Sequence, residues 1–203
     1  MSDMINGTED LDDTIPVGEP CCADAHNMSE TKCEYIPKNK YESLLYWLYK
    51  NDTYYEMIKI ASYAIVIFTV YVYFSSLVTT LWAGGITKLA KLVLITAVPF
   101  ACVSVVRRIV GAPRPYELLE FYDRAPKKKK AHSFPSRHVF SVFLIGTVLL
   151  AENLPIGILL LSLGVLLAVF RVLLGIHFIR DVVAGAISGA ISGVIGILIL
   201  HFI

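Results

Sequence analysis

A histidine and an aspartate stand four residues apart near the end of the chain, at His177 and Asp181. On a helix this spacing places both side chains on one face, where the carboxylate can fix the imidazole tautomer and stabilise its cation. Such a pair makes a nucleophilic or basic histidine. A second histidine, His138, can then serve as a general acid toward a leaving oxygen. An isolated His–Asp pair is more often a structural hydrogen bond than a catalytic pair. The other polar residues near the pair therefore decide between these two interpretations.

Three arginines supply positive charge near the ends of apolar stretches, at Arg107, Arg114 and Arg171. Their forked donors suit a tetrahedral oxyanion such as phosphate. Ser136 follows Pro135 at the start of an expected helix. Free backbone N–H groups and the helix dipole favour an anion there, and proline suits the first turn because it has no N–H. We expect no metal, because only one carboxylate is present and three arginines would repel a cation.

The elements that position these residues are apolar segments. The hydrophobic fraction is 56% and only 17% of residues are charged, whereas soluble domains carry about 25% charged residues. A membrane-spanning helix needs about 20 apolar residues. The gaps between charges predict an all-α integral membrane bundle of about five spans, at 60–87, 87–106, 134–152, 154–174 and 180–203. Gly84 and Gly85 mark the turn between the first two spans.

The alternating direction of these spans brings the polar residues together. Three segments that are distant in sequence, 107–115, 135–138 and 171–181, then lie on the same face of the membrane. Ionisable groups at the ends of membrane spans are costly and usually functional. The sequence therefore predicts one polar site at this face.

The N-terminal part differs in composition from the rest. Residues 1–56 hold twelve acidic residues and four lysines, and the remainder of the chain is basic. We expect a disordered acidic tail over 1–40, an amphipathic segment over 41–56 and the membrane domain over 57–203. The 41–56 segment is expected to be a helix on the membrane interface or an ordinary surface helix. No nucleic-acid partner is expected, because the basic residues form no polar stripe.

Two further patterns have simple explanations. No closed tetrahedral zinc pattern is formed by Cys21, Cys22, His26 and Cys33, so thiols in a flexible tail are expected.

Small residues recur every four positions in the last span, at Gly185, Gly189 and Gly193. That spacing lets helices approach closely in lipid. We expect close packing inside the bundle, and a homo-oligomer face is the secondary interpretation.

Taken together, the polar segments resemble the signature of the type 2 phosphatidic acid phosphatase superfamily. The family pattern is Lys-x6-Arg-Pro, then Pro-Ser-Gly-His, then Ser-Arg-x5-His-x3-Asp. This chain has the same order and internal spacing, in Arg107 with Arg114-Pro115, in Pro135-Ser136-Arg137-His138, and in Phe170-Arg171 with His177 and Asp181. The resemblance covers residues 60–203.

The resemblance implies a role for each matching residue. His177 would attack phosphorus and form a phosphohistidine, with Asp181 orienting the ring, and His138 would protonate the leaving oxygen. The phosphoryl oxygens would be held by Arg107, Arg114, Ser136, Arg171 and the backbone at Arg137. The reaction would need neither a metal nor another cofactor.

Three positions depart from the family pattern. Arg107 replaces lysine, Arg137 replaces glycine and Phe170 replaces serine. None of these changes removes a catalytic group. A sixth span, common in membrane members of the family, is also missing, and the 41–56 segment stands in its place.

The sequence therefore predicts a membrane phosphatase acting on a lipid phosphomonoester or a prenyl diphosphate, which approaches from the bilayer. Undecaprenyl diphosphate, phosphatidate and phosphatidylglycerol phosphate are the candidate substrates, with prenyl diphosphate slightly favoured. The alternative is a non-catalytic protein that binds lipid phosphates in the same pocket. We expect a bacterial cell membrane. The lysine run 127–130 favours a cytoplasmic site by the positive-inside rule, whereas family analogy favours the opposite face.

Overall fold

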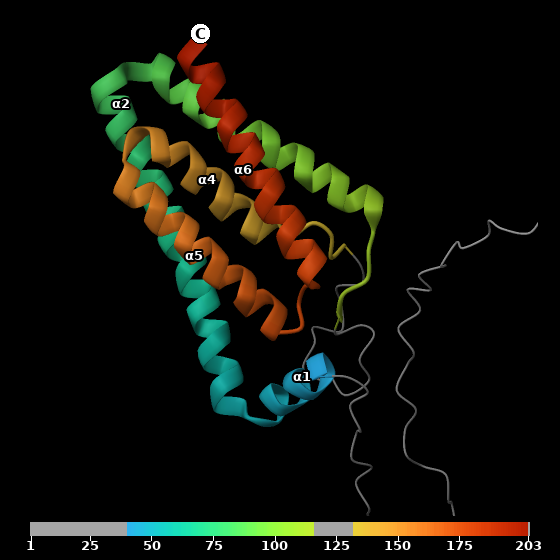
Figure 1. Cartoon of the computed structure of the whole chain (residues 1–203). Helices are drawn as coiled ribbons and strands as arrows, with labels where there is room; N and C mark the ends of the chain where they lie inside the picture. Colours follow the sequence, from blue (N-terminus) through green and yellow to red (C-terminus); the bar gives the residue numbers. More distant parts are fainter. Residues whose placement is uncertain (1–39, 116–131, 203) are drawn as a thin grey trace, which may run out of the picture.

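The chain folds into a bundle of helices (Figure 1). The computed structural model describes residues 40–115 and 132–202. Its helices are α1 (Lys40–Lys50), α2 (Asp52–Val110), α4 (Arg137–Glu152), α5 (Leu154–Leu173) and α6 (Ile179–Phe202). The predicted all-α class is confirmed. Most of the expected acidic tail, its cysteines and the lysine run 127–130 lie outside the described residues.

The first two predicted spans are the two legs of α2. The helix is continuous over 59 residues except at Gly85, where φ is 70° and ψ is −176°. Glycine adopts this backbone conformation without the steric cost that a side chain would add. The chain bends sharply there, so the second leg runs back along the bundle (Figure 1). The expected turn at Gly84 and Gly85 is therefore confirmed, since the non-helical backbone at Gly85 divides α2 into two helical legs.

Three helices of the described chain are long and apolar enough to cross a membrane: α2, α5 and α6. Helix α4 has 16 residues, which is short of the roughly 20 needed for a crossing by helix alone. It begins at Arg137, three residues later than the expected start near Phe134, because residues 132–136 enter it as non-helical backbone. The two legs of α2 together with α4, α5 and α6 nevertheless make five segments in the predicted order.

Helix α4 lies inside the bundle and packs mainly against α5 and α6. The glycines of α6 make this approach possible. A Cβ atom added at Gly185 would lie 2.7 Å from the carbonyl oxygen of Ser136, and one added at Gly189 would lie 2.5 Å from that of Phe140. Gly193 is equally close to Thr147. The small-residue stripe is therefore used for packing within the bundle, as the sequence predicts.

Helix α1 is shorter than the amphipathic segment expected from the sequence. It ends at Lys50, and residues from Asp52 onward belong to α2 because Asn51 interrupts the helix. Leu45 and Leu48 are buried, whereas Leu44 and Trp47 are exposed. One face thus packs on the protein while the other presents large apolar side chains. This pattern suits both an interfacial helix and a surface helix.

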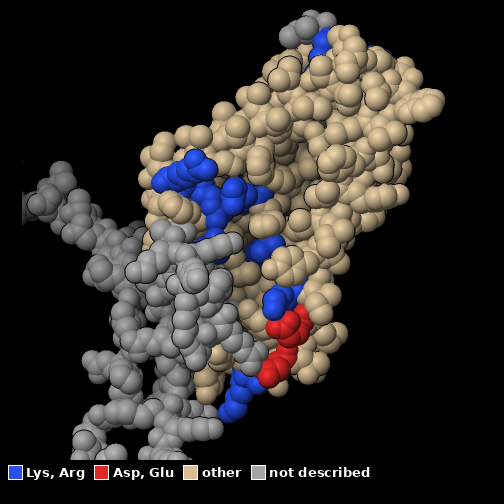
Figure 2. Space-filling model, turned by 180° about the vertical axis from the view of Figure 1, so that it is seen from behind, with Lys and Arg blue, Asp and Glu red and all other residues tan. Residues whose placement is uncertain are grey.

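The polar segments gather at one end of the bundle. The end of α2, the start of α4, the end of α5 and the start of α6 meet there, and α1 lies at the same end (Figure 1). On the face seen in Figure 2, charged side chains gather beside the undescribed residues, and most of the remaining surface is uncharged. The described residues of the three predicted polar segments therefore lie at one end of the bundle.

Candidate active site

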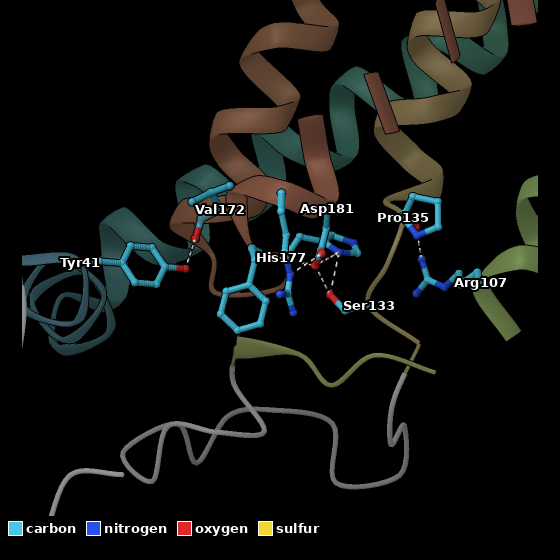
Figure 3. Close-up of polar contacts among 9 residues, drawn as sticks. Tyr41, Arg107, Ser133, Pro135, Val172, His177 and Asp181 are labelled. Carbon is cyan, nitrogen blue, oxygen red and sulfur yellow. Dashed lines mark hydrogen bonds and ion pairs between the residues drawn. The ribbon is translucent and has the colours of Figure 1, made fainter. Parts of the chain in front are cut away.

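The predicted pair of His177 and Asp181 is brought together at the start of α6, and Ser133 joins it (Figure 3). The Nδ1 atom of His177 lies 3.6 Å from Oδ2 of Asp181. The Ser133 hydroxyl lies 3.2 Å from the same Nδ1 atom and donates a hydrogen bond to Asp181 Oδ2. All three side chains are buried. The structure thus makes a triad from two sequence-distant segments.

Backbone groups hold the aspartate in place. The N–H of Phe178 donates to Oδ2 of Asp181 over 3.1 Å. The carbonyl oxygen of Asp181 accepts from the N–H of Ser136 over 3.0 Å. The second contact joins the start of α6 to the residue that precedes α4. The triad and the N-terminus of α4 are therefore fixed relative to each other.

The turn between α5 and α6 determines the position of His177. The backbone N–H groups of Ile176 and His177 both donate to the carbonyl oxygen of Arg171, over 3.2 and 3.3 Å. Gly175 has a φ of 62°, in the left-handed region that glycine adopts readily. The turn therefore holds the backbone of His177 against the last turn of α5, which contains Arg171.

The three arginines of the predicted phosphate site lie at this end of the bundle. Arg107 and Arg171 are buried and Arg114 is half-buried. Arg107 donates from Nη1 to the carbonyl oxygen of Pro135 over 3.3 Å, which links the end of α2 to the entrance of α4 (Figure 3). The charges of Arg107 and Arg114 both act on the His177 ring. The site is therefore strongly positive.

Several buried donors at the site have unmet hydrogen-bonding capacity. Considering only partners among residues 40–115 and 132–202, the Nε and Nη2 atoms of Arg171 and the Oγ atom of Ser136 make no hydrogen bond. Ser136 is the N-cap of α4, yet its hydroxyl does not cap the helix. Buried polar atoms are normally paired, so such a group of donors indicates a place for an acceptor. The N-terminus of α4 adds free N–H groups, including that of Arg137, and a favourable dipole for an anion.

The side chains of Arg137 and His138 face a different environment. Both are exposed and line a cavity of about 390 Å³ between the two legs of α2 and α4. The rest of the lining is mostly apolar, from Val66, Thr69, Val70, Phe100, Ser141, Val142 and Ile145. The predicted acid therefore stands where an apolar cavity reaches the polar site. The Arg137 side chain takes part in this lining, so only its backbone N–H belongs to the predicted phosphate cradle.

A second cavity continues the first. It has a volume of about 250 Å³ and shares Phe100, Ser141 and Ile145 with its neighbour. Tyr73 and Thr96, one from each leg of α2, line it and are joined by a hydrogen bond of 2.6 Å between their hydroxyl oxygens. A mostly apolar path therefore leads from His138 to this contact between the legs.

Helix α1 reaches the site through Tyr41. Its hydroxyl donates to the carbonyl oxygen of Val172 over 3.4 Å (Figure 3). Burial and the nearby negative charge of Asp181 raise the pKa of Tyr41 to about 12. The phenol is therefore a neutral donor at physiological pH, and it ties α1 to the last turn of α5.

Burial lowers the pKa of His177 below its usual value near 6.5, and the charges of Arg114 and Arg107 act in the same direction. The nearby negative charge of Asp181 opposes this shift. Protonation removes the lone pair that a nucleophile needs, so a lowered pKa keeps the ring reactive in weakly acidic solution.

We therefore expect the acidic limb of kcat/KM that belongs to His177 to lie below pH 6.5. Asp181→Asn should move this limb to still lower pH, because it removes a charge that favours the imidazolium ion. The measurement is a pH profile of both proteins with one substrate. An acidic limb at the same pH in both proteins belongs to the phosphate of the substrate. A limb that moves with Asp181→Asn but lies above pH 6.5 would contradict the lowered pKa of His177.

Ser133 is the member of the site that the sequence analysis does not predict. It lies at the end of the long loop, and its backbone N–H donates to the carbonyl oxygen of Ala112 over 2.8 Å. The preceding His132 has a φ of 73° and contacts the carbonyl oxygen of Arg107 through Nδ1. These contacts hold residues 132 and 133 against the site. Nothing in the spacing of the sequence indicates this placement.

Comparison with known proteins identifies the family. The sequence profile of the PAP2 superfamily matches residues 88–202, more than half of the chain. LpxE from Aquifex aeolicus shares 28% identity and a TM-score of 0.58, covering 72% of this chain and 87% of its own. A transmembrane PAP2-type phosphatidylglycerolphosphate phosphatase from Bacillus subtilis has the same fold, at 18% identity and a TM-score of 0.56. That likeness covers 80% of this chain and 93% of the other. No match was found among curated protein sequences. With the family's motifs at one end of a family-like bundle, the chain belongs to the PAP2 superfamily.

Proposed function

We propose that this protein is a membrane lipid phosphatase that works through a phosphohistidine intermediate without a metal. The membrane domain over 57–203 would carry the reaction. The observation that supports this most directly is a group of buried donors on Arg171 and Ser136 that have no hydrogen-bond partner in the described chain. The backbones of these two residues bond to those of His177 and Asp181. Family membership and the structural similarity to membrane phosphatases support the same reaction class.

In the first half of the reaction, Nε2 of His177 donates its lone pair to phosphorus. The bond from phosphorus to the leaving oxygen breaks, and that oxygen takes a proton from His138. The guanidinium groups, the Ser136 hydroxyl and the N–H groups of α4 hold the charge on the other phosphoryl oxygens.

In the second half, water attacks phosphorus and gives its proton to His138. The bond from nitrogen to phosphorus breaks and its electron pair returns to Nε2. His138 is thereby ready to act as an acid again, and inorganic phosphate leaves. Each half requires only groups that this chain supplies.

The apolar cavity supports a lipid substrate. It begins at His138, where the leaving oxygen would lie, and continues between the legs of α2. A hydrocarbon chain attached to that oxygen would occupy it. The substrate would thus be a lipid phosphomonoester or a prenyl diphosphate, such as undecaprenyl diphosphate, phosphatidate or phosphatidylglycerol phosphate. A bacterial cell membrane is the setting that the bacterial structural neighbours support.

The direct test is release of inorganic phosphate from these lipids by the purified protein in detergent micelles. We expect the rate in excess EDTA to equal the rate without it, because every group in the proposed mechanism is organic. Loss of activity on chelation with recovery on adding Mg²⁺ or Zn²⁺ would contradict the mechanism. Binding of the lipids without phosphate release would favour the non-catalytic alternative.

Filling the cavity should impair hydrolysis of lipid substrates and leave hydrolysis of soluble ones unchanged. Ile145 lines both cavities, so Ile145→Phe should obstruct the path at a cost of about 1–3 kcal/mol. We expect KM for a long-chain lipid phosphate to rise about tenfold, since about 1.4 kcal/mol corresponds to a factor of ten. Hydrolysis of a water-soluble aryl phosphate should be unchanged.

A matched control for this variant is Ile158→Phe, because Ile158 lies on the exposed face of α5 and is 52% exposed. It adds the same bulk outside the cavity. Equal KM values for the lipid substrate in both variants would exclude this cavity as the place of the hydrocarbon chain.

A further inference from the structure

The contact between the nucleophile and its carboxylate is not a direct hydrogen bond. Hydrogen bonds from nitrogen to oxygen have lengths of about 2.7–3.2 Å. The Nδ1 atom of His177 lies 3.6 Å from Oδ2 of Asp181, but only 3.2 Å from the Ser133 hydroxyl oxygen. That hydroxyl is itself bonded to Asp181 Oδ2. The serine therefore stands between the two residues.

The chemistry of the three groups fixes the direction of these hydrogen bonds. An ionised carboxylate only accepts, so the single proton of the Ser133 hydroxyl points to Asp181. The serine oxygen then has only lone pairs to offer to His177, so Nδ1 must carry a proton to bond with it. A neutral imidazole has one N–H, which leaves Nε2 with the lone pair. This chain of bonds selects the tautomer that the nucleophile needs.

The surroundings of Ser133 favour a fixed geometry. Its exposed fraction is 0%, and its backbone N–H is held by the carbonyl oxygen of Ala112. Asp181 Oδ2 also accepts from the backbone N–H of Phe178. The aspartate and the serine of this chain of bonds are thus both anchored to backbone. Hydrogen bonds in such a buried chain polarise and strengthen one another.

We propose that Ser133 is a positioning residue of the phosphatase reaction, whose hydroxyl transmits the effect of Asp181 to the Nδ1–H group of His177. This inference rests on the proposed function, because it assigns a role within that site. When Nε2 bonds to phosphorus, the ring becomes a cation and Nδ1 keeps its proton. The Ser133 oxygen then accepts a stronger hydrogen bond from this cation, and the Asp181 charge stabilises it through the serine.

The kinetic test compares Ser133→Ala with Asp181→Asn and with the double variant. We expect Ser133→Ala to lower kcat by about 10- to 100-fold, a smaller loss than the roughly 10⁴-fold that tautomer loss causes in serine proteases. KM should change by less than about twofold, because the three arginines proposed to hold the phosphate are unchanged. Ser133→Thr keeps the hydroxyl and should recover most of the activity.

The double variant distinguishes positioning from mere packing. If Ser133 acts through Asp181, adding Ser133→Ala to Asp181→Asn should lower kcat no further, because the two residues form one unit. Independent, multiplying losses would overturn the proposal. Ser162→Ala is the matched control, since Ser162 is a serine of α5 whose hydroxyl bonds only within its own helix turn in the described chain. It should keep the wild-type rate.

A spectroscopic measurement of the His177 tautomer does not depend on enzymatic activity. In protein labelled with ¹⁵N-histidine, the wild-type His177 ring should show a protonated Nδ1 and an unprotonated Nε2 at pH 7.5, and Ser133→Ala should mix the tautomers. An inactive wild type with the expected tautomer would contradict the proposed function, whereas selection of the tautomer through Ser133 would remain supported. A wild-type ring protonated at Nε2, or an unchanged Nδ1–H tautomer in Ser133→Ala, would overturn the inference. The wild-type spectrum alone decides if the alanine variant does not fold.

Discussion

Replacing the nucleophile should abolish turnover while leaving phosphate binding in place. We expect His177→Ala to lower kcat by at least about 10⁴-fold, in line with the loss of a catalytic nucleophile in other hydrolases. In the proposed mechanism the ring supplies the atom that bonds to phosphorus, whereas Arg107, Arg114 and Arg171 supply the positive charge that holds phosphate. The inhibition constant of inorganic phosphate should therefore change by less than about threefold. Steady-state kinetics with phosphate as a competitive inhibitor measures both quantities.

A chemical rescue controls for misfolding of this variant. The buried space left by the imidazole ring can admit free imidazole, which would accept the phosphoryl group in place of His177. We expect added imidazole to restore part of the activity of His177→Ala and to leave wild type unaffected. Multiple turnover above a few per cent of wild type without imidazole would exclude His177 as the nucleophile.

The second large effect concerns Arg171, whose Nε and Nη2 atoms are buried without a hydrogen-bond partner in the described chain. We expect Arg171→Leu to lower kcat/KM by about 10³-fold, since a transition-state arginine contributes about 10³–10⁵ in phosphoryl transfer. Phosphate inhibition should weaken as well, unlike in His177→Ala. Arg171→Lys keeps the charge but loses the planar fork, so an intermediate loss is expected.

Thermal unfolding distinguishes this loss from loss of the fold. Burying a charge costs free energy that burying an apolar side chain does not, so the melting temperature of Arg171→Leu should not fall. Arg108→Leu is the matched control, because Arg108 is an exposed arginine at the same end of the bundle. If Arg171→Leu and Arg108→Leu have kcat/KM values within threefold of each other, Arg171 does not hold the phosphate.

The sequence predicts the helices well because their signal is local. Charge-free stretches of sufficient length indicate spans whatever the tertiary packing, and the glycine spacing of α6 correctly predicts a close helix contact. Boundaries are less certain because they depend on single backbone conformations. The backbone conformation of Gly85 sets where the two legs of α2 separate, and the non-helical residues before Arg137 shorten α4.

The candidate site is predictable only where residues share a helix turn or a known motif. The four-residue spacing of His177 and Asp181 is confirmed as a close pair at 3.6 Å. Ser133 could not be found in this way, because its position depends on tertiary contacts of residues 132 and 133 with Arg107 and Ala112. The replacement of the family's serine by Phe170 also has a tertiary explanation, since Phe170 packs against the apolar cluster around Leu167.

The most direct test of the account is a rapid-quench experiment with a ³²P-labelled lipid phosphate. We expect alkaline quenching within the first turnover to trap protein-bound ³²P that is stable in base, is released in acid and maps to the peptide containing His177. The His177→Ala variant should trap none. Rapid phosphate release with no bound label at any time in the first turnover, or label on another residue, would contradict a phosphohistidine mechanism at His177.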